Sequence, residues 1–181
     1  NKTGWPNTGT WEVDTARFPG GLRAITDHIH EKGLKSLVWF EPERVTPGTW
    51  LYEQHPEWLL GKDGDQKLLN LGNPEARQWL TDHVDQLINE QGIDLYRQDF
   101  NMDPLGYWRE NDSGDRQGIT ENFHVQGDFA YWDELRKRHP DMLIDSCASG
   151  GRRNDLETLR RAVPLLRSDY IMEPVGNQCH T

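Results

Sequence analysis

The chain has 181 residues, of which 34% are hydrophobic and 28% charged, and its formal net charge at pH 7 is −10. This length can bury a sizeable core, and eight tryptophans, five tyrosines and five phenylalanines exclude a disordered composition. The 30 acidic against 20 basic residues argue against nucleic-acid binding, and no apolar run approaches the roughly 20 residues of a membrane span.

The first part of the chain predicts a helix followed by a buried strand. Three apolar residues recur at helical spacing ahead of a glycine that suits a helix C-cap: Leu22, Ile25, Ile29 and then Gly33. The short apolar stretch 34–40 is closed by Pro42 and predicts a strand. Residues 47–66 contain several Gly and Pro breakers and predict a loop or short helix, and residues 68–71 predict a second short strand.

The middle of the chain carries the clearest helix signals. Asn73 suits an N-cap and Pro74 the first turn, and Gly92 suits the end of the same helix. Residues 93–100 then predict a strand, and residues 103–121, rich in Gly, Asn and Asp, predict a polar loop.

The last part repeats the alternation. A third helix ends at Pro140, with three residues predicted to face inward: Phe129, Trp132 and Leu135. Residues 142–147 predict a strand, residues 156–163 a helix and residues 165–169 a last strand.

Strands that alternate with helices predict an α/β protein with parallel strands. A (β/α)8 TIM barrel and a doubly wound sheet both fit, because both place functional residues at the carboxyl ends of strands. No phosphate-binding glycine motif follows a strand, which weakens the nucleotide-binding version. A complete barrel takes about 250 residues, so residues 1–181 are expected to be the central part of one, about strands 2 to 6, with flanking domains outside the chain.

Polar side chains gather at the end of the 93–100 strand. Because side chains alternate along a strand, Arg97, Asp99 and Asn101 share one face. The cation would hold Asp99 ionised, as a nucleophile requires. The alternative is that Arg97 and Asp99 form an ordinary structural ion pair.

A second carboxylate, Asp169, ends the last predicted strand. Two carboxyl groups at strand ends that converge on one ligand suit glycoside hydrolysis, in which one attacks the sugar and the other transfers protons. Arg167 shares its face and would lower its pKa, which a general acid does not need, so we expect Arg167 to point elsewhere. The alternative is an aspartate that only begins a loop.

Two further strand ends contribute candidates for sugar binding. In WFEPER (39–44), Trp39 suits stacking on a sugar ring or packing in the core, and Glu41 suits orienting hydroxyl groups. In the turn SCASGG (146–151), glycine permits close approach of the backbone to a ligand. Cys147 there is either a small buried residue or a ligand contact.

No metal or other cofactor is expected. The chain has two cysteines, and its seven histidines form no recognised ligand spacing. The arginine-rich run 152–161 predicts a solvated helix with ion pairs.

Taken together, these strand ends resemble glycoside hydrolase family 36, the clan D α-galactosidases. The stretch WFEPER resembles the family's WFEPEM, and further blocks match in the same order: HPEW (55–58), LLNLGNPE (68–75), YRQDFN (96–101), SCASGGRRND (146–155) and LLRSD (165–169). The resemblance implies a (β/α)8 catalytic barrel and retaining double displacement on terminal α-linked galactose-type residues of an oligosaccharide or glycoconjugate.

The resemblance also implies a role for each candidate residue. Asp99 matches the nucleophile and Asp169 the acid/base. Five residues match positions that bind the sugar or shape its pocket: Trp39, Arg97, Asn101, Cys147 and Gly150. Glu41, in the matching WFEPER stretch, is kept as a candidate for substrate binding.

Three departures leave the sugar open. Arg97 replaces a lysine, Gln98 replaces a tryptophan, and the loop 61–66 is shorter and lacks the family's substrate-binding arginine. The alternatives are an α-N-acetylgalactosaminidase or α-galactosaminidase of the same family, and a non-catalytic carbohydrate-binding relative. The presence of both Asp99 and Asp169 favours an enzyme.

Overall fold

A three-stranded parallel sheet lies at the centre of the computed structural model, which describes residues 8–169, 173 and 175. Its strands lie in the order β1-β5-β6: β1 (Leu37–Phe40), β5 (Leu95–Gln98) and β6 (Leu143–Ser146). Each falls inside a stretch predicted as a strand. Parallel neighbours require crossover connections, and helices supply them, so the predicted α/β class is confirmed.

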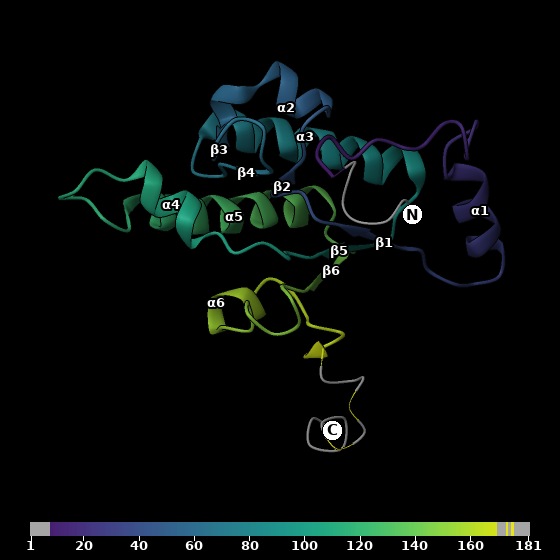
Figure 1. Ribbon diagram of the computed structural model, residues 1–181. Helices are drawn as coiled ribbons and strands as arrows, with labels where there is room; N and C mark the ends of the chain where they lie inside the picture. Colours follow the sequence, from purple (N-terminus) through teal and green to yellow (C-terminus); the bar gives the residue numbers. More distant parts are fainter. Residues whose placement is uncertain (1–7, 170–172, 174, 176–181) are drawn as a thin grey trace.

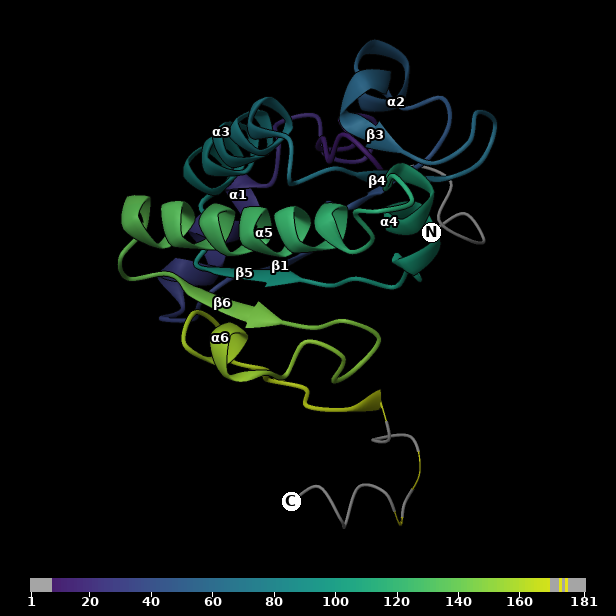
Figure 2. The ribbon, with the colours of Figure 1, turned by 90° about the vertical axis from the view of Figure 1, so that its left-hand side faces the viewer.

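Two long helices cover one face of this sheet. Figures 1 and 2 show α3 and α5 side by side above the strands, with α6 beyond β6. The helices that follow the predicted alternation are α1 (Arg23–Glu31), α3 (Pro74–Gln91), α5 (Ile119–Arg138) and α6 (Leu156–Leu159). The core between the helices and the sheet contains Phe40, Leu80, Val84, Tyr96, Trp132, Leu135 and Ile144, among others.

A small antiparallel sheet stands over the carboxyl end of β1. Its strands lie in the order β2-β4-β3: β2 (Arg44–Val45), β4 (Lys67–Leu69) and β3 (Leu59–Leu60). The short helices of this part of the structure are α2 (Trp50–Gln54), η1 (Pro56–Trp58) and α4 (Leu105–Asn111). Of the loop or short helix predicted for 47–66, the short helix is present as α2. The polar loop predicted over 103–121 is wrong in part, because it contains α4 and the first turn of α5. The strand predicted over 68–71 begins one residue earlier, as β4, and pairs in this second sheet.

The predicted ends of α3 are confirmed by their local chemistry. The side chain of Asn73 accepts hydrogen bonds from the backbone N–H groups of Glu75, at 2.9 Å, and Ala76, at 3.4 Å. Gly92 ends the helix with φ +66°, a conformation that favours glycine.

The predicted apolar stripe of α1 is wrong in detail. Ile25 is 46% exposed, and the buried residue of this helix is Thr26. The hydroxyl of Thr26 donates to the carbonyl of Gln91 at 2.7 Å, and Arg23 donates to the carbonyl of Asn89 at 3.1 Å. Polar contacts with the end of α3 therefore hold α1.

The inward face predicted for the third helix, α5, holds for Trp132 and Leu135, which are buried. Phe129 is half-buried, and the guanidinium of Arg161 lies 4.6 Å from its ring centre.

The strand predicted over 165–169 is also wrong. Val163 forms an isolated bridge with Asp145, and the N–H of Leu165 donates to the side chain of Asp145 at 2.9 Å. A side-chain acceptor thus takes the place of a strand carbonyl, and the described residues 165–169 run irregularly.

None of the helices in the described ranges has the length and apolarity needed to cross a membrane.

Candidate active site

The strand register brings the polar candidates onto one face of the central sheet. Trp39, Arg97 and Asp145 lie opposite one another on β1, β5 and β6. Asp99 and Cys147 follow two residues after Arg97 and Asp145, and hydrogen bonds continue the strand pairing there. The N–H of Asp99 donates to the carbonyl of Phe40, and the N–H of Cys147 donates to that of Gln98, both at 2.8 Å. The sheet thus presents two levels of polar side chains at its carboxyl edge.

Asp99 sits at the second level, with its carboxylate held by several donors. Trp39 Nε1 donates to Oδ2 at 3.1 Å, and the N–H of Phe100 donates to Oδ1 at 2.7 Å. Burial raises the pKa of Asp99, but interactions with the Asn101 side chain, Trp39, the Phe100 N–H and the Cys147 thiol outweigh it and lower the pKa. Asp99 is therefore ionised at neutral pH.

Arg97 does not act as the sequence predicted. Its guanidinium forms its ion pair with Asp145, which is buried, rather than with Asp99. The hydrogen-bond donors around Asp99, from side chains and from the Phe100 backbone, hold its carboxylate ionised. Arg97 contributes a nearby positive charge on the same face.

Trp39 is only half-buried, and its ring meets Trp11 edge-on with centres 5.5 Å apart. The indole N–H of Trp39 donates to Asp99, so Trp39 lies on the same polar face of the sheet.

Glu41 and Asn101 lie at the same edge. Glu41 is fully buried, and its Oε1 accepts hydrogen bonds from the N–H of Asn101 at 2.6 Å and from Arg44 Nε at 3.1 Å. Burial raises the pKa of Glu41, although Asn101 and Arg44 oppose this effect. Glu41 thus fixes the backbone that follows Asp99.

The turn after β6 contacts both Asp99, through Cys147, and Asp169, through Gly150. Burial raises the pKa of the Cys147 thiol, which interacts with Asp99 and also lies 3.8 Å from the carbonyl of Gly150. Gly150 has φ +84°, and a Cβ built there would lie 2.9 Å from the backbone nitrogen of Asp169 and 3.4 Å from its Cγ. Glycine therefore permits Asp169 to lie against this turn. The side chain of Asp169 is exposed.

The structure also shows a buried ion pair that the sequence reasoning missed. Arg153 donates to both oxygens of Glu43, at 2.8 and 2.5 Å, and its guanidinium lies 4.4 Å from the ring centre of Phe100. The sequence placed Arg153 in a solvated helix, but it lies in the loop before α6. A glutamate three residues beyond the end of β1 was the available signal, and its partner is distant in the sequence.

Further polar groups complete this network behind the sheet. Glu43 also accepts from His124 at 2.8 Å, and Gln98 donates to Glu43 at 3.2 Å and to Asp128 at 3.0 Å. Burial raises the pKa of Glu43, but Arg153 and His124 overcome this and lower it to about 2. Burial and the charge of Glu43 raise the pKa of Asp128 to about 6, against the opposing charge of Arg153.

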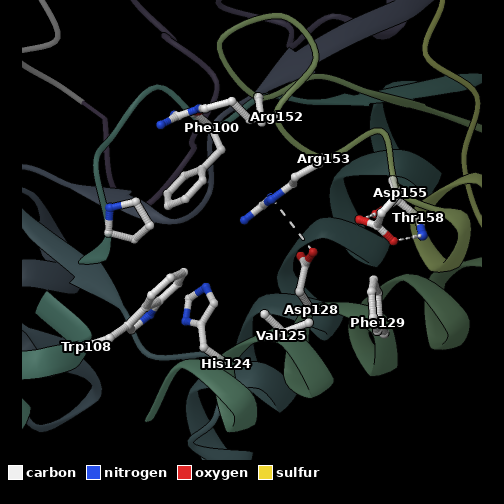
Figure 3. Close-up of a pocket in the computed structure, with 12 residues that line it drawn as sticks. Phe100, Trp108, His124, Val125, Asp128, Phe129, Arg152, Arg153, Asp155 and Thr158 are labelled. Carbon is white, nitrogen blue, oxygen red and sulfur yellow. Dashed lines mark hydrogen bonds and ion pairs between the residues drawn. The ribbon is translucent and has the colours of Figure 1, made fainter. Parts of the chain in front are cut away.

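A cavity of about 250 Å³ lies beside this network, between α5 and the segment that leads into α6. Figure 3 shows Arg153 reaching across it to Asp128, with Trp108 and His124 at one end. Neither Asp99 nor Asp169 lines it. The two carboxylates predicted to be catalytic therefore lie outside this cavity. Within the described ranges, no three His, Cys, Asp or Glu side chains are grouped to hold a metal ion.

Known proteins are similar to this chain in both sequence and fold. A family model described as Melibiase matches residues 5–175. The alpha-galactosidase Mel36A of Lactobacillus acidophilus is 32% identical over 155 residues, which is 82% of this chain and 21% of that protein.

Two solved structures show the same arrangement of elements. The alpha-galactosidase from Lactobacillus brevis matches with a TM-score of 0.80 and 30% identity, over 90% of this chain and 23% of that chain. A variant of the GH36 alpha-galactosidase AgaA from Geobacillus stearothermophilus, in complex with stachyose, matches with a TM-score of 0.80 and 25% identity, over 91% and 24%. The chain thus spans between a fifth and a quarter of the length of these relatives.

Proposed function

The chain belongs to the melibiase family, and we propose that it carries the catalytic centre of a retaining glycoside hydrolase that removes terminal α-linked galactose-type residues. The relatives named above are α-galactosidases, and one was solved with stachyose, so the proposed substrates are oligosaccharides or glycoconjugates with such a terminus. We further propose that residues 1–181 form the central part of a (β/α)8 barrel, about strands 2 to 6.

One observation carries the proposal. The ionised carboxylate of Asp99 lies at the carboxyl end of the middle strand, and the turn beside it brings Asp169 against Gly150. An ionised carboxylate is what a nucleophile needs, and the strand end is where barrel enzymes place their chemistry.

The proposed reaction has two steps. Asp99 attacks the anomeric carbon while Asp169 donates a proton to the leaving oxygen, so the C–O bond to the leaving group breaks as the bond to Asp99 forms. Asp169, now ionised, then takes a proton from water, and the resulting hydroxide displaces Asp99. With substrate bound, we expect the two carboxyl groups to lie about 5–5.5 Å apart.

Other residues on this face would bind the sugar. Trp39 offers an indole surface beside Asp99, and Asn101 and Cys147 interact with the same carboxylate. The carbonyl of Gly150 lies 3.8 Å from the Cys147 thiol. Glu41 supports them by fixing the backbone of Asn101.

The identity of the sugar depends on Arg97 more than on Gln98. Gln98 faces away from Asp99, where its amide oxygen accepts from Trp132 Nε1 at 2.7 Å. The Gln98 departure therefore lies outside the proposed sugar site. Arg97 lies on the site's face, and its guanidinium is paired with Asp145. Because the relatives named above are α-galactosidases, an α-galactoside is the first choice and an α-N-acetylgalactosaminide or α-galactosaminide the second.

The test is a screen of the full-length protein against nitrophenyl α-galactoside, α-N-acetylgalactosaminide and α-galactosaminide, with the β-galactoside as control. We expect turnover of the α-galactoside and none of the β-anomer. Turnover of an amino sugar instead would correct the substrate. A folded protein that binds galactose but hydrolyses none of the four would be a carbohydrate-binding relative.

A further inference from the structure

Ser149 occupies a strained place in the turn after β6. Its φ of +43° lies in the left-handed region, which residues other than glycine rarely adopt. It lies between Cys147 and Gly150, the two turn residues that border the proposed site. A serine kept in such a conformation at an active site suggests that its side chain has a role there.

The hydroxyl of Ser149 reaches the segment that follows Asp99. It donates to Asn101 Oδ1 at 3.2 Å and lies 3.5 Å from the carbonyl oxygen of Phe100. It accepts a hydrogen bond from Arg152 Nη2 at 3.1 Å. The same nitrogen of Arg152 lies 2.9 Å from the Phe100 carbonyl and 2.8 Å from that of Met102. Arg152 therefore fixes both the hydroxyl and the segment that it contacts.

The bond from Ser149 determines which way the Asn101 amide faces. Its oxygen is taken by Ser149, so its amino group is the end left to act on Asp99, whose pKa the Asn101 side chain lowers. If the amide rotated by 180°, its oxygen would face the Asp99 carboxylate. The backbone of Asn101 cannot follow, because its N–H donates to Glu41 and its carbonyl accepts from Arg44 Nη2, each at 2.6 Å.

We propose that Ser149 is a positioning residue, which holds the Asn101 amide with its amino group toward the nucleophile Asp99. The inference rests on the proposed function and adds to it a residue that acts through Asn101. Donors that face Asp99 favour its ionised form, so loss of the hydroxyl should make the nucleophile harder to ionise.

Two substitutions separate the hydroxyl from the backbone strain. Ser149→Ala removes the hydroxyl and keeps a side chain at positive φ, whereas Ser149→Gly removes the hydroxyl and relieves the strain. Ser146→Ala is the matched control, since the buried hydroxyl of Ser146 has no hydrogen-bond partner among the described residues.

In the full-length protein, we expect both Ser149 variants to lose about tenfold in kcat/KM for an aryl α-galactoside, as loss of a hydrogen bond that acts on a charged group implies. The acid limb of the kcat/KM profile should move to higher pH in both. Ser146→Ala should behave as the unmodified protein. An unchanged acid limb and unchanged kcat/KM in both Ser149 variants would overturn the inference.

A second readout does not depend on turnover. The ¹³C carboxyl resonance of Asp99, identified by its absence in Asp99→Asn, can be titrated in the unmodified protein and in Ser149→Ala. A higher Asp99 pKa in Ser149→Ala supports the inference, and an unchanged titration overturns it. If the unmodified protein hydrolyses no α-glycoside, the proposed function fails, and this titration still decides the role of Ser149.

Discussion

Arg97 on β5 and Asp145 on β6 lie directly opposite each other and form an ion pair on the same face of the sheet as Asp99. The Asp145 carboxylate is buried, and its other oxygen accepts the N–H of Leu165 at 2.9 Å. One carboxylate therefore fixes both the cation beside the proposed nucleophile and the start of the segment that carries Asp169.

The substitution Asp145→Asn should test this double role. Asparagine keeps an oxygen for the Leu165 N–H but leaves the charge of Arg97 unpaired, so we expect a loss of about 3–5 kcal/mol in the free energy of unfolding. An unpaired Arg97 would also favour ionised Asp99 and move the acid limb of kcat/KM to lower pH. Denaturant unfolding and a pH–rate profile measure the two effects.

The control is Asp133→Asn, which breaks a surface pair with Arg161. It should cost less than about 1 kcal/mol. Equal stability of Asp145→Asn and the unmodified protein would show that the Arg97–Asp145 pair does not form in solution.

Asp128 should make stability fall as the pH rises. Its pKa in the folded protein is about 6, against an ordinary 3.8, because the buried carboxyl group resists ionisation. The folded state therefore holds a proton that the unfolded state releases between these values, and the free energy of unfolding declines across pH 4 to 6. Asp128→Asn should remove this decline, as measured by denaturant midpoints at several pH values. A decline that persists in Asp128→Asn would assign it to another group.

Gly127 permits α5 to lie against the backbone of Leu71 more closely than a residue with a side chain would allow. A Cβ built on it would lie 2.0 Å from the carbonyl oxygen of Leu71, a backbone atom that cannot move aside cheaply. We expect Gly127→Ala to cost more than about 3 kcal/mol in stability. Gly106 in α4 is the matched control, because a Cβ there meets nothing within 4 Å. Gly106→Ala should be neutral or stabilising by about 0.5–1 kcal/mol. Equal melting temperatures for the two variants would contradict the packing of α5 on this loop.

Removal of the proposed nucleophile gives a chemical test of mechanism. Asp99→Ala should abolish turnover of aryl α-galactosides, and azide should partly restore it by taking the place of the missing carboxylate. Asp103→Ala, an exposed carboxylate four positions along the chain, is the control and should keep its activity. Full activity of Asp99→Ala would defeat the mechanism.

The sequence predicted best those features that short stretches of chain decide. The ends of α3 depend on Asn73 and Gly92, whose caps involve only their neighbours, and both signals were correct. The apolar run 34–40 likewise contained β1. Strand alternation placed Arg97 and Asp99 on one face, although it did not show which partner Arg97 takes.

The features that were missed depend on contacts between distant segments. Glu43 and Arg153 are 110 positions apart, and nothing local to either marks them as a pair. Leu165 lies in a stretch with the composition of a strand, but its N–H is used by the Asp145 side chain. Thr26 is buried in place of Ile25 because the end of α3 offers it a carbonyl. Pattern alone does not contain this information.

The identity of the nucleophile is the central claim, and covalent trapping tests it most directly. A 2-deoxy-2-fluoro galactosyl donor with a good leaving group should inactivate the full-length protein and accumulate as a glycosyl-enzyme. Peptide mass spectrometry should then find one added sugar on the peptide that contains Asp99. A label on a different residue, or undiminished turnover without any label, would contradict the account.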